Sequence, residues 1–116
     1  MATVTPTVLN VVQNDKGYDL TFTITDENGS PVNITGATIK FKMGQPGETL
    51  VINGTPTCNV VGDGSTGQCT YTVQDNDFKT VGDYDAELEI TFSGGSPVHT
   101  IPDIKVHVKG ELESPT

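Results

Sequence analysis

The sequence predicts an all-β fold, an immunoglobulin-like β-sandwich of about seven to eight strands. Three observations lead to this prediction. Apolar and polar residues alternate along several short segments, turn-forming glycines and prolines separate those segments, and the period of an amphipathic helix does not occur. With 116 residues, 34% of them hydrophobic, the chain has the size of one domain with its own core.

Four segments show the alternation most clearly, and each is expected to bury one face and expose the other. In chain order they are residues 18–25, 38–43, 84–92 and 104–109. Weaker strands are expected at 7–12, 49–52, 57–61 and 68–73. The intervening turns read DENGSP, GQPGE, GDGS and SGGSP. We expect Pro102 to interrupt the chain between His99 and His107, because proline donates no ladder hydrogen bond.

The chain divides into an N-terminal arm over residues 1–8, the sandwich over 9–109 and a polar tail over 110–116. Its net charge is −9, and all six basic residues are lysines. An acidic chain without arginine repels nucleic acid, so we expect no nucleic-acid partner. No apolar run approaches the length of about 20 residues that spans a membrane, so we expect no membrane partner.

The charges on three segments predict their order in one sheet. Lysines point outward from 38–43 and 104–109, whereas Asp85, Glu87 and Glu89 point outward from 83–92. In an immunoglobulin-like sheet these segments would be strands C, G and F, with the acidic strand F between the two basic ones. Opposite charges on neighbouring strands stabilise that order. The alternatives are a dedicated cation-binding face and simple solvation of the charges.

A tyrosine corner is expected at Tyr84. The step Gly82-Asp-Tyr84 lies at the start of the acidic strand, where a tyrosine hydroxyl bonds back to the preceding corner in immunoglobulin-like folds. The alternative is an ordinary core tyrosine.

The two cysteines are expected to face each other. If Asp63 and Gly64 are the central residues of a type I′ turn, Cys58 lies opposite Cys69, within disulfide range. That register makes them a hydrogen-bonded pair, which is the wider kind of antiparallel pair. Two interpretations stay open, a disulfide and two small buried residues in contact.

No arrangement of residues predicts catalysis or a cofactor. The serines lie in turns or in the tail, outside any nucleophile context, and the two histidines have no cluster of further ligands. The best candidates for a cation are Asp75 and Asp77, joined by Asp83, as calcium ligands in a loop. The simpler alternative is a capped helical turn, in which Asp75 or Asp77 leads into residues 78–80.

Two segments are candidate interfaces. The arm offers Val4, Pro6 and Val8, which would dock on a neighbouring subunit by strand addition unless the terminus frays. The segment 44–56 offers Leu50, Val51 and Ile52 between turns, as an edge strand or a contact surface.

Several stretches resemble one known family. They are the run GYDLTFTITDENGSPVNITGA from Gly17, the run GQCTYTV from Gly67, the run VGDYDAELEI from Val81 and a proline-containing final strand. Together they resemble the N-terminal domain of phage baseplate upper proteins over roughly residues 8–109. The resemblance implies an immunoglobulin-like module that anchors a larger protein to the virion, with host recognition in later domains. No receptor-binding domain follows residues 110–116 here, so we expect an excised domain or a small virion protein, such as a decoration or adaptor subunit.

Two functions therefore stand beside each other. The first is a non-enzymatic structural and assembly protein of a tailed-phage virion, made in the bacterial cytoplasm, which contacts other virion proteins and itself in many copies. The alternative is a cell-surface or adhesin-type module that binds a protein or a glycan, and an enzyme-associated accessory domain is a distant third. Phe 4, Tyr 3 and no Trp leave few aromatic rings on which a sugar can stack, which argues against a glycan.

Overall fold

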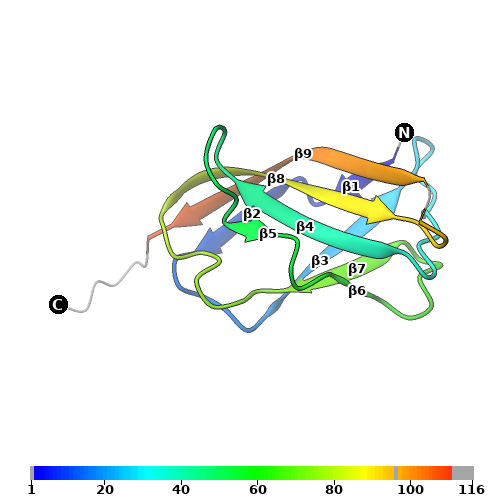
Figure 1. Ribbon diagram of the computed structural model, residues 1–116, viewed down its shortest axis with the longest axis horizontal. Helices are drawn as coiled ribbons and strands as arrows, with labels where there is room; N and C mark the ends of the chain where they lie inside the picture. Colours follow the sequence, from blue (N-terminus) through cyan, green and yellow to red (C-terminus); the bar gives the residue numbers. More distant parts are fainter. Residues whose placement is uncertain (1, 96, 111–116) are drawn as a thin grey trace.

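The computed structural model describes residues 2–95 and 97–110, and within them it is an all-β sandwich of two sheets (Figure 1). One sheet has the strand order β1-β3-β7-β6 and the other β2-β9-β8-β4-β5. The strands are β1 Thr3–Thr5, β2 Val8–Val12, β3 Asp19–Thr25, β4 Thr38–Gly44, β5 Ile52–Asn53, β6 Asn59–Val60, β7 Gln68–Thr72, β8 Gly82–Thr91 and β9 Val98–Lys109. The predicted fold class is confirmed, and the described residues contain no helix.

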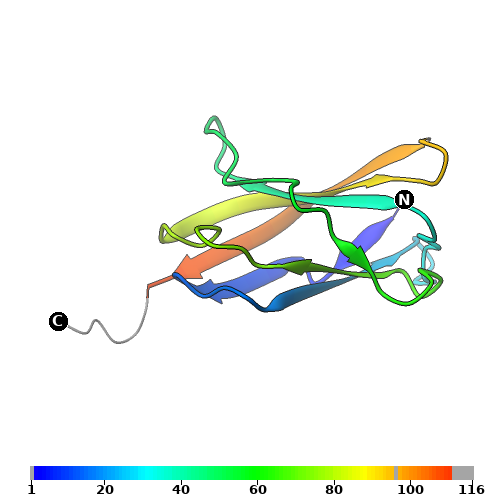
Figure 2. The same cartoon turned by 60° about the horizontal axis from the view of Figure 1, so that its bottom comes forward.

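Figure 2 shows the two sheets as separate layers. Alternating side chains from both sheets fill the space between them. Three aromatic rings lie at the centre: the centroid of Phe41 is 5.3 Å from that of Phe22 and 5.1 Å from that of Tyr71. Tilted rings at these distances add to the free energy gained from burying their apolar area. The alternation read from the sequence therefore corresponds to one continuous core.

The first strand pair differs from the expected arm. Thr3–Thr5 pairs antiparallel with β3, and the side chain of Val4 is buried opposite Ile24. The chain then crosses to the second sheet through Pro6, and Val8–Val12 pairs parallel with β9. Residues 3–12 thus supply an edge strand to each sheet of their own domain, and the arm packs on that domain because exposing Val4 would leave a gap in the core. Val4 is not available as a contact residue.

The acidic strand β8 lies between β4 and β9, as the charge pattern predicted. Asp85 is opposite Lys105, and their side chains form an ion pair of 2.5 Å. The ammonium of Lys42 lies 3.2 Å from Glu89, diagonally across from it. Such cross-strand pairs contribute about 0.2–1 kcal/mol each at a surface and oppose any strand order that brings like charges together.

Strand β9 runs through Pro102 without ending, so the expected interruption is wrong. Ala86 is opposite Ile104 and Leu88 is opposite Ile101, which leaves Pro102 and Asp103 facing the single residue Glu87. Two residues opposite one form a β-bulge, where a proline breaks no ladder bond. Asp103 has a φ of 69°, so the backbone turns locally and re-enters the strand.

The corner before β8 is built by two tyrosines. The hydroxyl of Tyr84 donates a 2.6 Å hydrogen bond to the carbonyl of Thr80, which is the geometry of a tyrosine corner. The carboxylate of Asp77 accepts bonds from the hydroxyl of Tyr71 and from the backbone N–H of Gln74. Residues 75–78 form a turn rather than the helical turn that the sequence suggested.

Removing the Tyr84 hydroxyl tests the corner. We expect Tyr84→Phe to lower the free energy of unfolding by about 1–2 kcal/mol, since the Thr80 carbonyl loses its donor in a partly buried place. Urea denaturation measures the loss. Tyr18→Phe is the control, because Tyr18 is exposed and should change stability by less than about 0.5 kcal/mol. Equal losses in both variants would contradict a special role for the corner.

The cysteine register differs from the expected one. Val60 is opposite Cys69 and Asn59 is opposite Thr70, so Cys58 is not directly opposite Cys69. Gly62, Gly64 and Gly67 all have positive φ, and the N–H of Val61 bonds to the carbonyl of Gln68, which gives a loop longer than a two-residue turn. The two thiols nevertheless meet in the core, where a hydrogen bond to Cys69 and burial raise the pKa of Cys58. Both cysteines are free thiols here, and a disulfide stays a prediction.

Candidate interaction surface

The outer faces of the two sheets differ in chemistry. Strands β1, β3 and β7 present a threonine-rich face, made of Thr3, Thr5, Thr21, Thr23, Thr25, Thr70 and Thr72 together with Asp19 and Gln68. Strands β4, β8 and β9 present a charged face, made of Lys40, Lys42, Asp85, Glu87, Glu89 and Lys105. The alternation of each strand fixes this division, because most outward positions on one side are threonines and most of those on the other are ionised.

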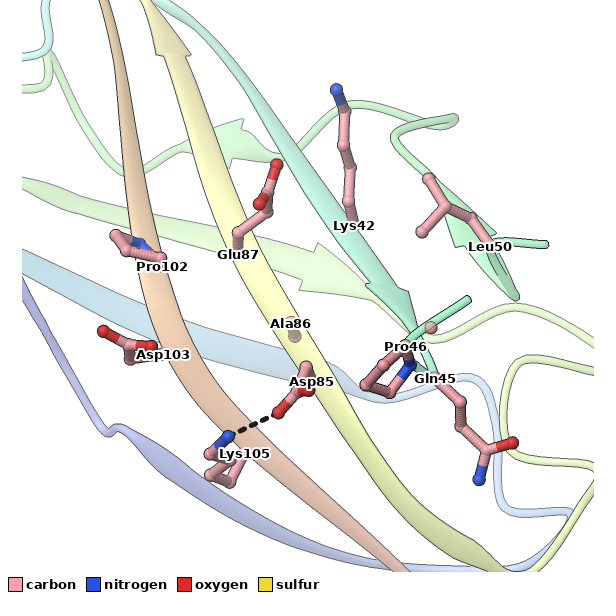
Figure 3. A pocket seen from close by; sticks show the side chains of 11 residues that line it. Lys42, Gln45, Pro46, Leu50, Asp85, Ala86, Glu87, Pro102, Asp103 and Lys105 are labelled. Carbon is pink, nitrogen blue, oxygen red and sulfur yellow. Dashed lines mark hydrogen bonds and ion pairs between the residues drawn. The ribbon is translucent and has the colours of Figure 1, made fainter. Parts of the chain in front are cut away.

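A hollow of about 410 Å³ opens on the charged face (Figure 3). The loop 45–51 forms one side with Pro46 and Leu50, and the bulge of β9 forms the other with Pro102 and Asp103. Glu87 of β8 lies between these two sides. The hollow therefore combines apolar walls with charges of both signs at its rim.

Contacts with Gly44 and backbone hydrogen bonds fix the loop that carries the exposed side chain of Leu50. The side chain leans on Gly44: its Cδ2 atom lies 3.0 Å from where a Cβ at that residue would stand. The N–H of Val51 donates to the carbonyl of Met43, and the N–H of Glu48 donates to the carbonyl of Gln45. These two bonds give the loop a defined shape. It projects away from the body of the sandwich (Figures 1 and 2).

The three apolar residues expected at an interface are therefore separated. Leu50 is 46% exposed and Val51 is 44% exposed, whereas Ile52 is only 2% exposed. Ile52 begins β5 opposite Met43 and points into the core, as the alternation along β5 requires. Including Ile52 among the contact residues was wrong for this reason.

The candidate calcium ligands do not come together. Asp75 pairs with Lys16 at 3.1 Å, Asp83 lies 2.6 Å from Nδ1 of His107, and Asp77 is held by Tyr71 and Gln74. Across residues 2–95 and 97–110, no three histidine, cysteine or acidic side chains group as metal ligands would. Each carboxylate has a structural partner of its own.

Sequence reasoning missed two features of this surface. The contact of His107 with Asp83 follows from counting along β8 and β9 from the Asp85–Lys105 pair, so the signal was present. The hollow was not readable, because it depends on the bulge at Pro102 and on the way loop 45–51 folds back.

Comparison with known families gives one clear match. The model of the BppU N-terminal domain family matches residues 6–112, which is most of the chain. The chain belongs to this family. The BppU N-terminal domain is the N-terminal domain of a phage baseplate upper protein, so the resemblance read from the sequence is confirmed. Comparison with curated proteins gave no match.

Membership of the BppU N-terminal domain family identifies a phage baseplate-associated structural protein. The family places the domain in the virion, in contact with other virion proteins. This favours the first of the two functional hypotheses over the adhesin-type module. In the part of the chain that the structure describes, no helix has the length and apolar character to cross a membrane.

Proposed function

We propose that this BppU N-terminal domain is a non-enzymatic adaptor that joins baseplate proteins through protein–protein contacts. The observation that carries this proposal is the hollow with Leu50 on its rim. Leu50 and Val51 are large apolar side chains held in the open by a shaped loop. Apolar anchors surrounded by polar groups are typical of the centre of a protein interface.

The chemistry of the hollow suits an extended segment of another virion protein. An apolar side chain of the partner would fit between Leu50 and Pro102, both of which line the hollow. Around it, Lys42 and Glu87 supply a donor and an acceptor for the polar backbone of the partner. The ion pair of Lys105 with Asp85 holds the lower rim in place (Figure 3).

The aromatic side chains support a protein partner over a glycan. Sugar sites stack rings on exposed aromatic faces. Among the described residues, Tyr18 is the one exposed aromatic side chain, and it does not line the hollow.

The Leu50→Asp substitution tests the contact. We expect the variant domain to fold normally, with a change in the free energy of unfolding within about 0.5 kcal/mol, because the side chain is exposed. We also expect incorporation into particles to fall by about tenfold or more, since a carboxylate loses its water in an apolar contact. Quantitative mass spectrometry of purified virions gives the copy number of each variant.

Thr21→Asp is the matched control. It adds the same charge on the exposed threonine-rich face, away from the hollow, and should be incorporated like the natural sequence. Equal incorporation of both variants would contradict the proposal. A Leu50→Asp domain that does not fold would show that Leu50 belongs to the core.

A further inference from the structure

Strand β2 is an edge strand that lacks the usual protection. It pairs on one side with β9 and ends its sheet on the other (Figure 1). Natural edge strands carry charges, prolines or bulges that prevent pairing with another chain. The five residues of β2 read VLNVV and include none of these. Val8 is 48% exposed and Val12 is 37% exposed, so apolar side chains accompany the free backbone.

Two hydrogen bonds at the ends of β2 determine where its free backbone groups point. The carbonyl of Thr7 accepts from the N–H of Lys105 at 2.8 Å, and the N–H of Gln13 donates to the carbonyl of Lys109 at 2.8 Å. Backbone groups in a parallel pair face the neighbour at every second residue. Leu9 and Val11 therefore face β9, and Val8, Asn10 and Val12 direct their N–H and C=O groups away from the sheet. Of these, the carbonyl of Val12 already accepts the N–H of Asp15.

The free edge is nearly symmetric about its centre. Val8 and Val12 lie at equal distances in sequence on either side of Asn10. When two copies of β2 pair antiparallel about a two-fold axis at Asn10, Asn10 faces its own copy, and Val8 of one chain faces Val12 of the other. Apart from the carbonyl of Val12, which already accepts the N–H of Asp15 and would have to accept a second bond, the backbone groups at these positions are free. Each opposed pair of this kind exchanges two hydrogen bonds.

Charge also favours this edge. The chain carries −9, so two copies repel each other unless the surfaces that meet are free of carboxylates. Strand β2 has no charged residue, and the outward side chains beside it on β9 are Lys105, His107 and Lys109. The carboxylates one strand further away, Asp83 and Asp85, are bound to His107 and Lys105.

We propose that β2 is a self-association edge: two copies of this chain pair β2 with β2 antiparallel about Asn10 and join their five-stranded sheets into one. Two strands of five residues bury less than the roughly 1,200 Å² of a stable complex, so the free dimer is weak and forms at high concentration. On a particle that holds many copies side by side, the same contact is strengthened by multivalency. The proposal is independent of the hollow.

Sedimentation velocity over a wide range of protein concentration, up to millimolar, tests the dimer. We expect the average mass of the natural sequence to rise towards that of a dimer as concentration increases. Asn10→Lys, which brings two ammonium groups together on the axis, should stay monomeric. Asn59→Lys is the matched control on β6, the edge of the other sheet, and should dimerise like the natural sequence. A natural sequence that is monomeric at the highest concentration, or Asn10→Lys that still dimerises, overturns the proposal.

A cross-linking experiment covers the case in which Asn10→Lys fails to fold. Opposed residues in such a pair have Cα atoms about 5.5 Å apart, within the range of a disulfide. We expect Asn10→Cys to form a covalent dimer with a mild oxidant such as diamide, which takes up the two electrons and two protons of the thiols. Asn59→Cys should stay monomeric under the same conditions. Failure of Asn10→Cys to cross-link, or equal cross-linking by both, contradicts the proposal. Leu50→Asp should leave the dimer unchanged, which separates this contact from the hollow.

Discussion

Gly67→Ala is expected to cost the domain about 3–4 kcal/mol, a large part of the 5–15 kcal/mol that usually holds a folded domain together. The φ of Gly67 is +73°, which an L side chain adopts only with strain. A Cβ at this residue would lie 2.4 Å from the carbonyl oxygen of Ile24 and 3.0 Å from that of Val32. Both obstacles are backbone atoms, so a rotamer change cannot relieve them.

The same place carries the hydrogen bonds that join three segments. The N–H of Ile24 donates to the carbonyl of Gly67, and the N–H of Val32 donates to the carbonyl of Ile24. Moving residue 67 away from β3 therefore weakens both bonds. Urea denaturation at neutral pH measures the loss as a lower midpoint.

Gly29→Ala is the matched control for this prediction. Gly29 has a similar φ of +85°, but a Cβ there meets nothing within 4 Å. It should show only the conformational cost, about 1 kcal/mol. If both variants lower the free energy of unfolding by the same amount, the clash with the carbonyl oxygen of Ile24 does not contribute to the cost of Gly67→Ala.

Asp77→Ala is expected to cost about 2–4 kcal/mol, the second large effect. Its carboxylate accepts the hydroxyl of Tyr71 at 2.5 Å and the N–H of Gln74 at 2.8 Å. Tyr71 lies in the centre of the core beside Phe41, so its hydroxyl loses its partner where water does not reach. Thermal and urea unfolding of the variant measure the cost.

A double-mutant cycle with Tyr71→Phe isolates the bond. Once the hydroxyl is absent, removing the carboxylate leaves fewer polar groups unpaired, so the double variant should lose less than the two single losses added together. Additive losses would contradict the coupling.

Burial and the neighbouring Asp77 raise the pKa of Tyr71 above its ordinary value. The contribution of the Tyr71 hydroxyl to stability is therefore fully present below pH 10 and is lost as the pH rises beyond 10. Tyr71→Phe should reduce that alkaline loss.

Periodicity and charge were reliable guides where neighbouring strands are long. The alternation of Leu20, Phe22 and Ile24 predicted which side of β3 is buried, because the pleat places every second side chain on one face. The opposite charges of Lys105 and Asp85 predicted that β9 and β8 are neighbours. These are local or pairwise effects, and a single sequence contains them.

Features that depend on loop geometry were not predictable in the same way. The observed register of Cys58 and Cys69 differs from the expected one because several glycines lie in the loop between the strands. A difference of one residue in the length of that loop shifts every pair along the two strands. Ile52 and Leu50 looked alike in the sequence, but only Ile52 lies in a paired strand. The hollow depends on the β-bulge at Pro102. From the sequence, that proline had predicted an interruption of the strand instead.

The sequence by itself determined the class of fold, the order of the acidic strand between its basic neighbours and the family. Burial periodicity, charge pairing and a characteristic run of residues all act along the chain or between adjacent strands, so they can be read directly from it. Only the tertiary structure decided that residues 3–5 complete the first sheet, that Leu50 stands beside a hollow and that the outward backbone of β2 is free. Those outcomes depend on how distant segments compete for the same core and the same hydrogen bonds, and that competition is settled only when the whole domain packs.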